Sequence, residues 1–584
     1  MILEFFSKLS CYYLISHQPF SMKKRIFLLC FLIMHLASGQ EKFPKDVFRP
    51  PLDIPLILAG TFGELRSNHF HSGIDIKTQQ RQGLPVYAIG DGTVTRIKVS
   101  HWGYGKALYV AHPNGYTSVY AHLQKFSPEI EEYVKQTQYQ KRSYEIEVFP
   151  EYGKLKVYKD SMIAYTGNTG GSSGPHLHFE IRSSVTEKPT NPMLYGLDIR
   201  DATNPTLQGL YAYPLSEGAV VNQSELRVQI PISRQPDGTY LADEVKANGT
   251  IGFGVAAYDR QDLAANQNGL YKLEQKVNGT LISSFDFDSF SFGETRLINT
   301  LIDYEYMSKY RRRIQKCFKA EGNKLSIYSQ LKNDGKITVK EGLNYSVEIN
   351  LKDLAGNLTR VIIPVSGRRE EAVNKKEIPK TEHYIVAGKP NNFELGKVKL
   401  YFPANTFYND FHIDLRASGD TVTVHNNSVP AHKNFTLSFN TDGYEESFLQ
   451  RAFIARLDDK LRPNYNKTYK RGNTFTTRTR SLGTYTIAQD TIPPKIRSKN
   501  FKSKQWLTNY RYLSLLISDD LSGINSYEAT LNGEWILMEY EPKTSTLTYN
   551  FDDKILDKKQ CNLQVVVTDN VGNSTTFTSS FYRN

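Results

Sequence analysis

The hydrophobic and polar positions of the N-terminal third follow the pattern of short β-strands joined by tight turns. Residues 86–89 and 93–97 are apolar runs that flank an Asp-Gly turn, and this arrangement predicts a β-hairpin. Residues 107–110 and 116–120 flank a Pro-Asn-Gly turn, which predicts a second hairpin. From about residue 43 to residue 196 the chain is therefore expected to form antiparallel sheet.

One helix is predicted inside this region, over residues 129–140. Ser127 is a suitable N-cap, and Pro128 fits the first helical position, where its missing N–H is not needed.

Two stretches of the C-terminal half repeat the same strand-and-turn pattern. Residues 349–357 read INLKDLAGN and residues 565–573 read VVVTDNVGN, so that each apolar strand ends in an aspartate and a Gly-Asn turn. Residues 255–259 and 515–519 form a second matching pair, which ends in Asp259 and Asp519. Repeated strands of this kind predict immunoglobulin-like β-sandwich domains. In the first pair of stretches, residues 349–357 and 565–573, the aspartates are Asp353 and Asp569.

The length of 584 residues predicts about four domains. Tyr and Phe are abundant, with 37 and 31 residues, and this favours a mainly β protein. The charged segment 368–382 is interpreted as a linker, and residues 491–494 as a second one. The predicted division is a signal peptide region 1–39, a first domain 40–200, a β-rich domain 201–367, the linker 368–382, a β-sandwich domain 383–488 and an immunoglobulin-like β-domain 489–584.

The N-terminus has the pattern of an export signal. Residues 23–25 are basic, residues 26–36 are largely apolar, and residues 37–39 are small enough for a cleavage site. The apolar run is short for a bilayer span, so no stable membrane span is expected after cleavage; a retained membrane anchor is the alternative. We therefore expect an exported protein of the periplasm or cell envelope, or an extracellular one.

The formal net charge of +12 agrees with an acidic polymer or cell wall as partner. No RNA- or DNA-binding motif is found, so a nucleic-acid partner is not expected. Two of the four cysteines fall in the leader, and the others are far apart, which argues against a disulfide framework and against a Cys-x-x-Cys zinc site.

Histidines are concentrated in the first domain. Seven of the 13 lie between His69 and His178, and five of these form three clusters. In the first cluster, His71 and Asp75 are four residues apart. A straight strand would separate them by ~13 Å, but Gly73 between them allows the backbone to bend, so that both can reach one ion.

The other two clusters lie in apolar strands. His122 ends one strand, and His176 and His178 are two residues apart in another, so that both face one side of it. Two or three histidines and one aspartate match catalytic zinc, which usually has three protein ligands and an open position. The spacing alone does not identify the ligands, because His69 and His71 form a pair of the same kind.

The segments HSGID, YAHL and GNTGGSSGPHLHFEIR resemble the LytM/lysostaphin-type zinc metallopeptidases of family M23, over roughly residues 55–196. The resemblance implies an antiparallel β-sheet peptidase domain. It also implies that His71, Asp75 and His178 bind Zn²⁺, and that His122 and His176 flank the water that the zinc activates. Residues 128–160 form an insert relative to a minimal member. Glu180 is interpreted either as a residue that supports the ligands or as a surface carboxylate.

The resemblance implies an exported zinc metalloendopeptidase (EC 3.4.24.-) that hydrolyses peptide cross-links of peptidoglycan. Stem peptides and glycine bridges are both family substrates, and the absence of a recognisable SH3-like wall-binding module favours directly cross-linked stem peptides. The alternatives are a non-catalytic relative that binds the wall or activates other hydrolases, and a wall-anchored adhesin. Protein partners of the C-terminal β-domains, the oligomeric state and autoinhibition are not predicted.

Overall fold

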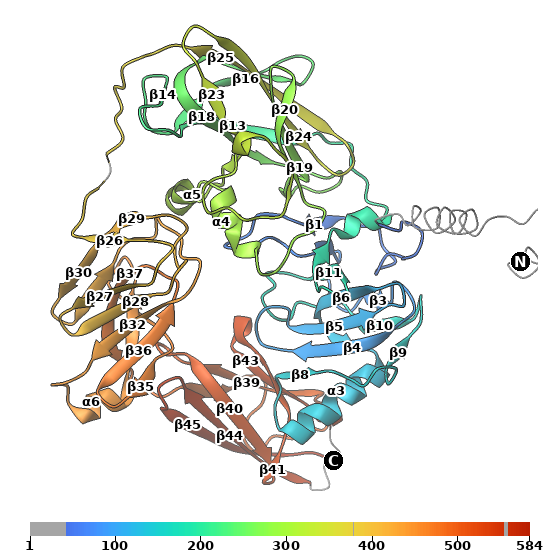
Figure 1. The fold of residues 1–584 in the computed structure, drawn as a ribbon. Coiled ribbons are helices and arrows are strands. Elements are labelled where there is room, and N and C mark those ends of the chain that lie inside the picture. The colour runs from blue at the N-terminus through green and yellow to red at the C-terminus, as the bar shows by residue number, and fades with distance from the viewer. Residues whose placement is uncertain (1–42, 378, 554–558) are drawn as a thin grey trace, which may run out of the picture. The chain divides into compact units, whose positions relative to one another are not determined.

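The computed structural model describes residues 43–377, 379–553 and 559–584, and it is mainly β, as predicted (Figure 1). The predicted signal peptide lies outside these residues. Residues 43–48 and 194–196 form a small unit in which Phe43 and Phe48 pack against the ring of Tyr195. In the part of the chain that is described, no helix combines the length and the apolar character needed to cross a bilayer.

The N-terminal region contains a nine-stranded antiparallel sheet that carries the predicted metal ligands. The strands lie in the order β1-β2-β11-β6-β5-β4-β8, and β12 and β9 pair with β11 and β4. The bounds are β1 Leu58–Gly60, β2 Ile74–Lys77, β11 His176–Ser183, β6 Tyr116–Leu123, β5 Lys106–Ala111, β4 Gly92–Val99, β8 Ile146–Val148, β12 Pro189–Thr190 and β9 Lys156–Val157.

The predicted helix and the second predicted hairpin are present. Helix α3 spans Pro128–Lys141, with Pro128 in its first turn, although the Ser127 side chain makes no capping hydrogen bond. Strands β5 and β6 pair directly across the Pro-Asn-Gly turn. Together with α3, strands β8 and β9 make up the insert of residues 128–160.

The first predicted hairpin is wrong. Strand β3 (Pro85–Tyr87) pairs with β10 (Met162–Tyr165), and β10 pairs with β7 (Lys125–Phe126), which makes a separate three-stranded sheet. The pairing with the later segment continues beyond β3, because Ala88 N donates to Ser161 O at 2.9 Å. The chain therefore crosses from one sheet to the other at the Asp-Gly turn, although that turn is a strong local hairpin signal.

Residues 206–367 contain a second, 13-stranded sheet. Its main path follows the order β15-β13-β18-β25-β24-β19-β20-β22. The bounds are β15 Val228–Ile230, β13 Thr206–Pro214, β18 Val245–Tyr258, β25 Leu358–Gly367, β24 Asn344–Lys352, β19 Lys272–Val277, β20 Thr280–Asp286 and β22 Tyr328–Leu331, with the short helices α4 Ile298–Leu301 and α5 Tyr304–Tyr310. The shorter strands are β14 Val220–Val221, β16 Ile232–Arg234, β17 Tyr240–Ala242, β21 Gln315–Lys316 and β23 Ile337–Val339.

Residues 383–489 form two five-stranded sheets around one apolar core, with a two-stranded sheet and a short helix beside them. The first has the order β27-β28-β32-β36-β35, and the second β30-β31-β37-β33-β34. Their bounds are β27 Asn391–Leu395, β28 Val398–Phe402, β32 Phe435–Asn440, β36 Thr474–Thr479, β35 Tyr469–Arg471, β30 Leu415–Ser418, β31 Thr421–Val424, β37 Gly483–Gln489, β33 Ala452–Leu457 and β34 Pro463–Tyr465, with β26 His383–Ile385, β29 Phe411–Ile413 and α6 Glu446–Arg451.

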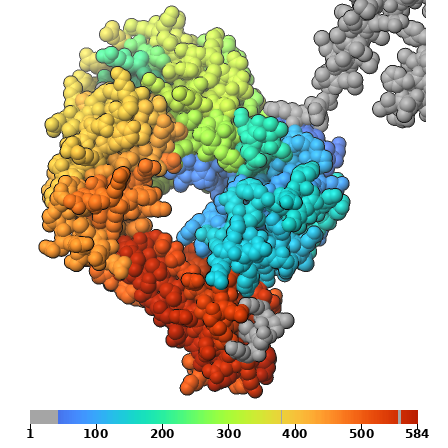
Figure 2. Space-filling view, turned by 60° about the horizontal axis from the view of Figure 1, so that its bottom comes forward, coloured from blue at the N-terminus to red at the C-terminus, as the bar shows by residue number. Residues whose placement is uncertain are grey.

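Residues 495–582 form two four-stranded sheets that share another core. The orders are β38-β39-β43-β42 and β41-β40-β44-β45. The bounds are β38 Lys495–Ser498, β39 Tyr512–Ser518, β43 Thr546–Asn550, β42 Met538–Glu541, β41 Glu534–Trp535, β40 Ile524–Leu531, β44 Gln560–Asp569 and β45 Ser574–Tyr582. Figure 2 shows each of these regions as a continuous body in its own range of colour.

The segment between β25 and β26 contains the predicted linker, residues 368–382. Val373 N donates to Gln223 O at 2.8 Å, but no strand or helix forms among the described residues of 368–382. The basic residues of the segment are all exposed, namely Arg368, Arg369, Lys375, Lys376 and Lys380. Residues 373, 374 and 376 hydrogen-bond to residues 223 and 225, but the segment is exposed and outside the regular sheets, which makes it a preferred site of proteolysis.

We predict that a low concentration of trypsin cuts first within residues 368–382 and releases a stable C-terminal fragment. The measurement is limited proteolysis of the whole protein, followed by mass analysis of the first fragments. Cleavage elsewhere while this segment remains intact would contradict the division.

Candidate metal centre

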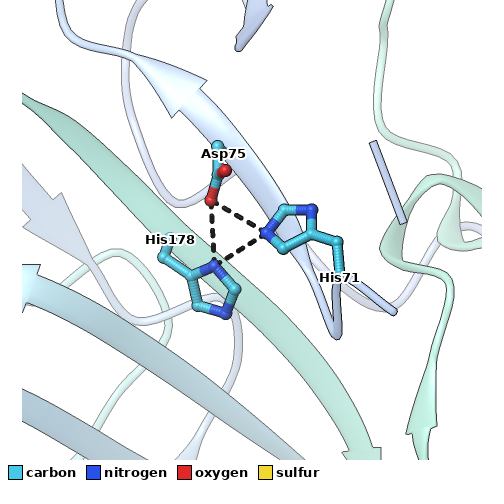
Figure 3. A group of neighbouring side chains, drawn as sticks. All are labelled: His71, Asp75 and His178. Atoms are coloured by element: carbon cyan, nitrogen blue, oxygen red, sulfur yellow. Dashed lines mark hydrogen bonds and ion pairs between the residues drawn. The ribbon is translucent and has the colours of Figure 1, made fainter. Parts of the chain in front are cut away.

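Three side chains from two distant segments of the sequence meet at one point (Figure 3). His71 Nε2 lies 3.0 Å from Asp75 Oδ1 and 3.1 Å from His178 Nδ1, and His178 Nδ1 lies 2.9 Å from Asp75 Oδ1. All three residues are buried. These are the three residues that the resemblance assigned as ligands, and the arrangement is a candidate metal centre.

The pairing of β2 with β11 brings the three together. His178 and Asp75 are direct partners in the register of these antiparallel strands, and His71 lies in the segment that leads into β2. Gly73, between the two predicted ligands, lies at a bend of the backbone, as predicted. A Cβ atom at Gly73 would lie 2.3 Å from Phe179 O, so the glycine lets this segment approach the backbone of β11 closely.

Hydrogen bonds on the outer side of the cluster fix which atoms face inward. His71 Nδ1 lies 2.8 Å from Thr61 O, a carbonyl that can only accept, so Nδ1 carries the hydrogen and Nε2 presents a lone pair. His178 Nε2 lies 2.9 Å from Glu180 Oε1 in the same way, which leaves the lone pair on Nδ1. Arg66 Nη2 donates to the other oxygen of Asp75 at 2.9 Å. Three acceptor atoms therefore point at one another.

This donor set fits a metal ion. Three acceptors in mutual contact leave each other without a donor, and a cation at their centre satisfies all three. Two imidazole nitrogens and one carboxylate oxygen are typical ligands of catalytic Zn²⁺. Tetrahedral bonds of about 2.0–2.2 Å place ligand atoms about 3.3–3.6 Å apart. The observed spacings of 2.9–3.1 Å would need to widen by a few tenths of an ångström to admit the ion. The residues present therefore fit a zinc ion and leave one position for another ligand.

Strong interactions within the cluster shift the pKa values of Asp75 and His178. Burial alone would raise the pKa of Asp75, but His71 and hydrogen bonds from His176 and His178 hold that pKa well below its usual range. Burial alone would lower the pKa of His178, but its hydrogen bonds to Asp75 and Glu180 raise it to about 9. The site therefore stabilises positive charge at its centre, which favours a cation there.

His122 and His176, the two residues predicted beside the water, lie next to this cluster. Their ring centroids are 4.7 Å apart, and His176 Nε2 lies 3.4 Å from Asp75 Oδ1. His122 Nδ1 lies 2.8 Å from Thr169 O, and His176 Nδ1 lies 2.9 Å from Gly174 O. Both rings therefore hold their hydrogen on Nδ1 and keep a proton-accepting lone pair on Nε2.

Burial, with smaller contributions from His178 and His176, lowers the pKa of His122 to about 3, so His122 stays neutral near pH 7. The glycine-rich loop holds this residue in place. Gly167 packs against the backbone of His122, where a Cβ would lie 2.6 Å from His122 O, and Thr169 supplies the carbonyl that orients the ring. The loop is thus packed against β6 and positions one of the site histidines.

Glu180 is fully buried and supports His178, so it is not a surface carboxylate. Arg182 Nε donates to Glu180 Oε2 at 2.6 Å, Ser72 Oγ donates to Oε1 at 2.6 Å, and Tyr104 OH also donates to Oε1. A carboxylate that accepts the second ring hydrogen of a metal-binding histidine fixes the ring and raises its basicity. Residues 178, 180 and 182 share one face of β11, and this alternation could have predicted the network.

Arg66 and Glu64 are the parts of the site that sequence reasoning missed. Arg66 bridges Asp75 and Glu64, with Arg66 Nε 3.2 Å from Glu64 Oε1. Both lie in an irregular loop before His71, where no periodicity indicates what a side chain contacts. The remaining histidines of the region lie elsewhere: His69 is exposed and contacts Ser67 O, and His112 contacts Asp91 O.

Comparison with known proteins supports a peptidase. Residues 69–139 match the model of peptidase family M23, which confirms the resemblance, and residues 382–490 match a Zu5-like domain. The "DD-carboxypeptidase/endopeptidase Mpg" of Neisseria meningitidis is 34% identical over 139 residues, which are 24% of this chain and 26% of that protein. The "Peptidoglycan DD-endopeptidase ShyA" of Vibrio cholerae is 32% identical over 123 residues, 21% of this chain and 22% of that protein.

The similarity is thus confined to one region, and the chain spans about a quarter of the length of these relatives. A solved structure, "a zinc containing peptidase from vibrio cholerae", is 26% identical and covers 26% of this chain and 41% of that one, with a TM-score of 0.20.

Glu180 allows a test of the cluster that does not depend on activity. In Glu180→Gln the ring of His178 loses a charged acceptor, and loss of such a partner typically costs 10–100-fold in metal affinity. We predict this loss for Zn²⁺ titrated into the metal-free protein, measured against a competing chromophoric chelator. Glu187→Gln is the matched control, because Glu187 also contacts Arg182 (3.4 Å) but is exposed, and it should keep the wild-type affinity. Equal affinities in both variants would contradict the assigned role of Glu180.

Proposed function

We propose that the protein is an exported zinc metalloendopeptidase that hydrolyses peptide cross-links of peptidoglycan. The observation that carries the proposal is the convergence of His71 Nε2, Asp75 Oδ1 and His178 Nδ1, with two further histidines beside them. The relative named as a peptidoglycan DD-endopeptidase supports the substrate class, and the family of the matched region supports the reaction.

The chemistry divides between the ion and the chain. His71, Asp75 and His178 would hold a Zn²⁺ ion, which when bound would polarise the scissile carbonyl and lower the pKa of a water. His122 is a neutral acceptor at Nε2, and the Nδ1 hydrogen of His176 is likewise held by a carbonyl, so that the Nε2 atom of His176 faces the centre. One can take a proton from the attacking water, and the pair can then hold the negative charge that develops on the carbonyl oxygen by donating a hydrogen bond.

A surface pocket of about 440 Å³ is lined by neighbours in sequence of the site residues, although by none of the five site residues themselves. It is lined by Gly174 and Pro175, which immediately precede His176, and by Lys77 at the end of β2. A peptide bound there would lie along the strand that carries two of the site histidines. The positive Lys77 also suits a substrate that contains carboxylates.

A non-catalytic relative is the second candidate. Loss of a ligand or of a flanking histidine would favour it, but all five residues are present and close together. We therefore favour an active enzyme over the non-catalytic relative. Its location in the periplasm or cell envelope is part of the same hypothesis.

The three ligands should be needed for both metal and activity. We predict one zinc per chain in the wild type, and its loss in His71→Ala, Asp75→Ala and His178→Ala, because each change removes one of only three protein donors. Zinc content is measured by elemental analysis, and activity by digestion of purified sacculi with mass analysis of the released fragments. His69→Ala is the matched control: this exposed histidine lies two residues from His71 and should change neither quantity. Stoichiometric zinc in His71→Ala would refute the assignment.

The flanking histidines should separate turnover from metal binding. We predict that His122→Ala and His176→Ala keep their zinc and lose about 10²–10⁴-fold in the rate of sacculus digestion, the usual contribution of general acid–base catalysis. Binding of the substrate should change little, since neither ring is proposed to hold the peptide. If His176→Ala loses zinc while His178→Ala keeps it, the roles in the H-x-H motif are reversed. Full activity with zinc bound in both variants would place the active site elsewhere.

A further inference from the structure

Three aspartates meet in the β-rich region of residues 201–367, in a cluster that the proposed peptidase chemistry does not use. Asp201 precedes β13, Asp259 follows β18, and Asp353 follows β24. One carboxylate oxygen of each lies within 4.8 Å of those of the other two. Among the described residues, no Lys, Arg or His side chain forms an ion pair with any of the three. The cluster therefore gathers negative charge with no protein cation to balance it.

One carboxylate oxygen in the cluster has no partner. Asp259 is only 3% exposed, and its Oδ1 atom is buried without a hydrogen bond. A buried acceptor in this state costs free energy unless a ligand satisfies it. Asp353, in contrast, is held in position: Gly356 N and Asn357 N donate to its Oδ1, both at 2.8 Å. The site thus combines a fixed carboxylate with one that has an unsatisfied oxygen, and an oxygen of each lies within 4.8 Å of the other.

Burial and the charges of Asp201 and Asp353 raise the pKa of Asp259 to about 8. Burial also raises the pKa of Asp201 to about 6, and the charges of Asp353 and Asp262 add to this effect. Without a cation, repulsion among the three carboxylates therefore destabilises the folded protein, and an added positive charge would relieve this repulsion.

The same arrangement occurs a second time. Asp490, Asp519 and Asp569 also bring their carboxylates within 4.8 Å, at the matching places before β38, after β39 and at the end of β44. The supporting contacts match as well. Asn357 Nδ2 donates to Asp353 Oδ2 and to Asp201 O, and Asn573 Nδ2 donates to Asp569 Oδ2 and to Asp490 O. Two sequences with few residues in common therefore keep the same carboxylate geometry.

We propose that Asp201, Asp259 and Asp353 bind a divalent cation of the Ca²⁺ class. The donors are all oxygen, which suits a hard cation and not Zn²⁺, whose sites include nitrogen or sulfur as a rule. Ca²⁺ accepts six to eight oxygens in an adaptable geometry, so that three carboxylates, backbone carbonyls and waters can complete its shell. Mg²⁺ demands strict octahedral geometry and usually takes only one or two carboxylates.

The cation would join three segments that are distant in sequence. Asp201 lies just before the first strand of this region, and Asp259 and Asp353 lie where two of its strands end. A bound ion therefore ties the entry of the chain to two strand ends, and it stabilises the folded state because the unfolded chain has no such site.

Calcium binding is tested by equilibrium dialysis of the whole protein, as purified and without chelator, against ⁴⁵Ca²⁺. We expect Asp259→Asn to bind one Ca²⁺ fewer than the wild type, whether or not the second cluster also binds. Asp243→Asn is the matched control, since Asp243 is an exposed aspartate of the same region, and it should bind as the wild type does. Equal stoichiometry in Asp259→Asn and the wild type overturns the proposal.

Thermal unfolding separates a cation site from a purely structural role. At a hundredfold excess of Ca²⁺ over its Kd, the transition of this region should rise by about 5 °C or more in the wild type, and Asp259→Asn should lose this rise. Without Ca²⁺, Asp259→Asn should be at least as stable as the wild type, because the amide removes the repulsion. A variant that is less stable without Ca²⁺ but keeps the full Ca²⁺-dependent rise overturns the proposal. Neither measurement uses peptidase activity, so failure of the calcium-site proposal can be told apart from failure of the proposed function.

Discussion

The contact on which the site depends is that of three proton-accepting atoms held about 3 Å apart. His71 Nε2, Asp75 Oδ1 and His178 Nδ1 would not stay together in the absence of positive charge, since none of them can donate to the others once their outer hydrogen bonds are made. The pairing of β2 with β11 forces them together all the same. The cluster therefore needs positive charge at its centre, which either a proton on His178 or a bound metal ion can supply, and the buried surroundings strengthen that need.

The same logic extends outward from the centre. Each ring at the site is fixed by an acceptor on its far side: a backbone carbonyl for His71, His122 and His176, and the buried carboxylate of Glu180 for His178. These acceptors decide which nitrogen of each ring faces the centre. The aspartate cluster of the β-rich region follows a related rule, with oxygen donors only, and so it selects a different kind of cation.

The sequence predicted much of this arrangement, and its failures have physical causes. Alternation in β11 correctly placed Leu177 and Phe179 in the core and the two histidines on the other face. The hairpin over residues 86–97 was wrong because a turn signal is local, whereas the partner of β3 comes from a distant segment. The ligands were assigned from a family resemblance, since spacing could not choose between His69, His71 and His176. Arg66 and Glu64 could not be found, because loop residues carry no periodicity that indicates their contacts.

The central claim is that one metal ion is held by His71 Nε2, Asp75 Oδ1 and His178 Nδ1, with His122 and His176 outside its coordination shell. Anomalous diffraction at the zinc edge from crystals of the zinc-loaded protein tests this most directly. The account predicts a single strong peak at bonding distance from those three atoms, with His178 binding through Nδ1 while its Nε2 stays on Glu180. A peak bonded to His178 Nε2, or to His176 in place of His178, would contradict it.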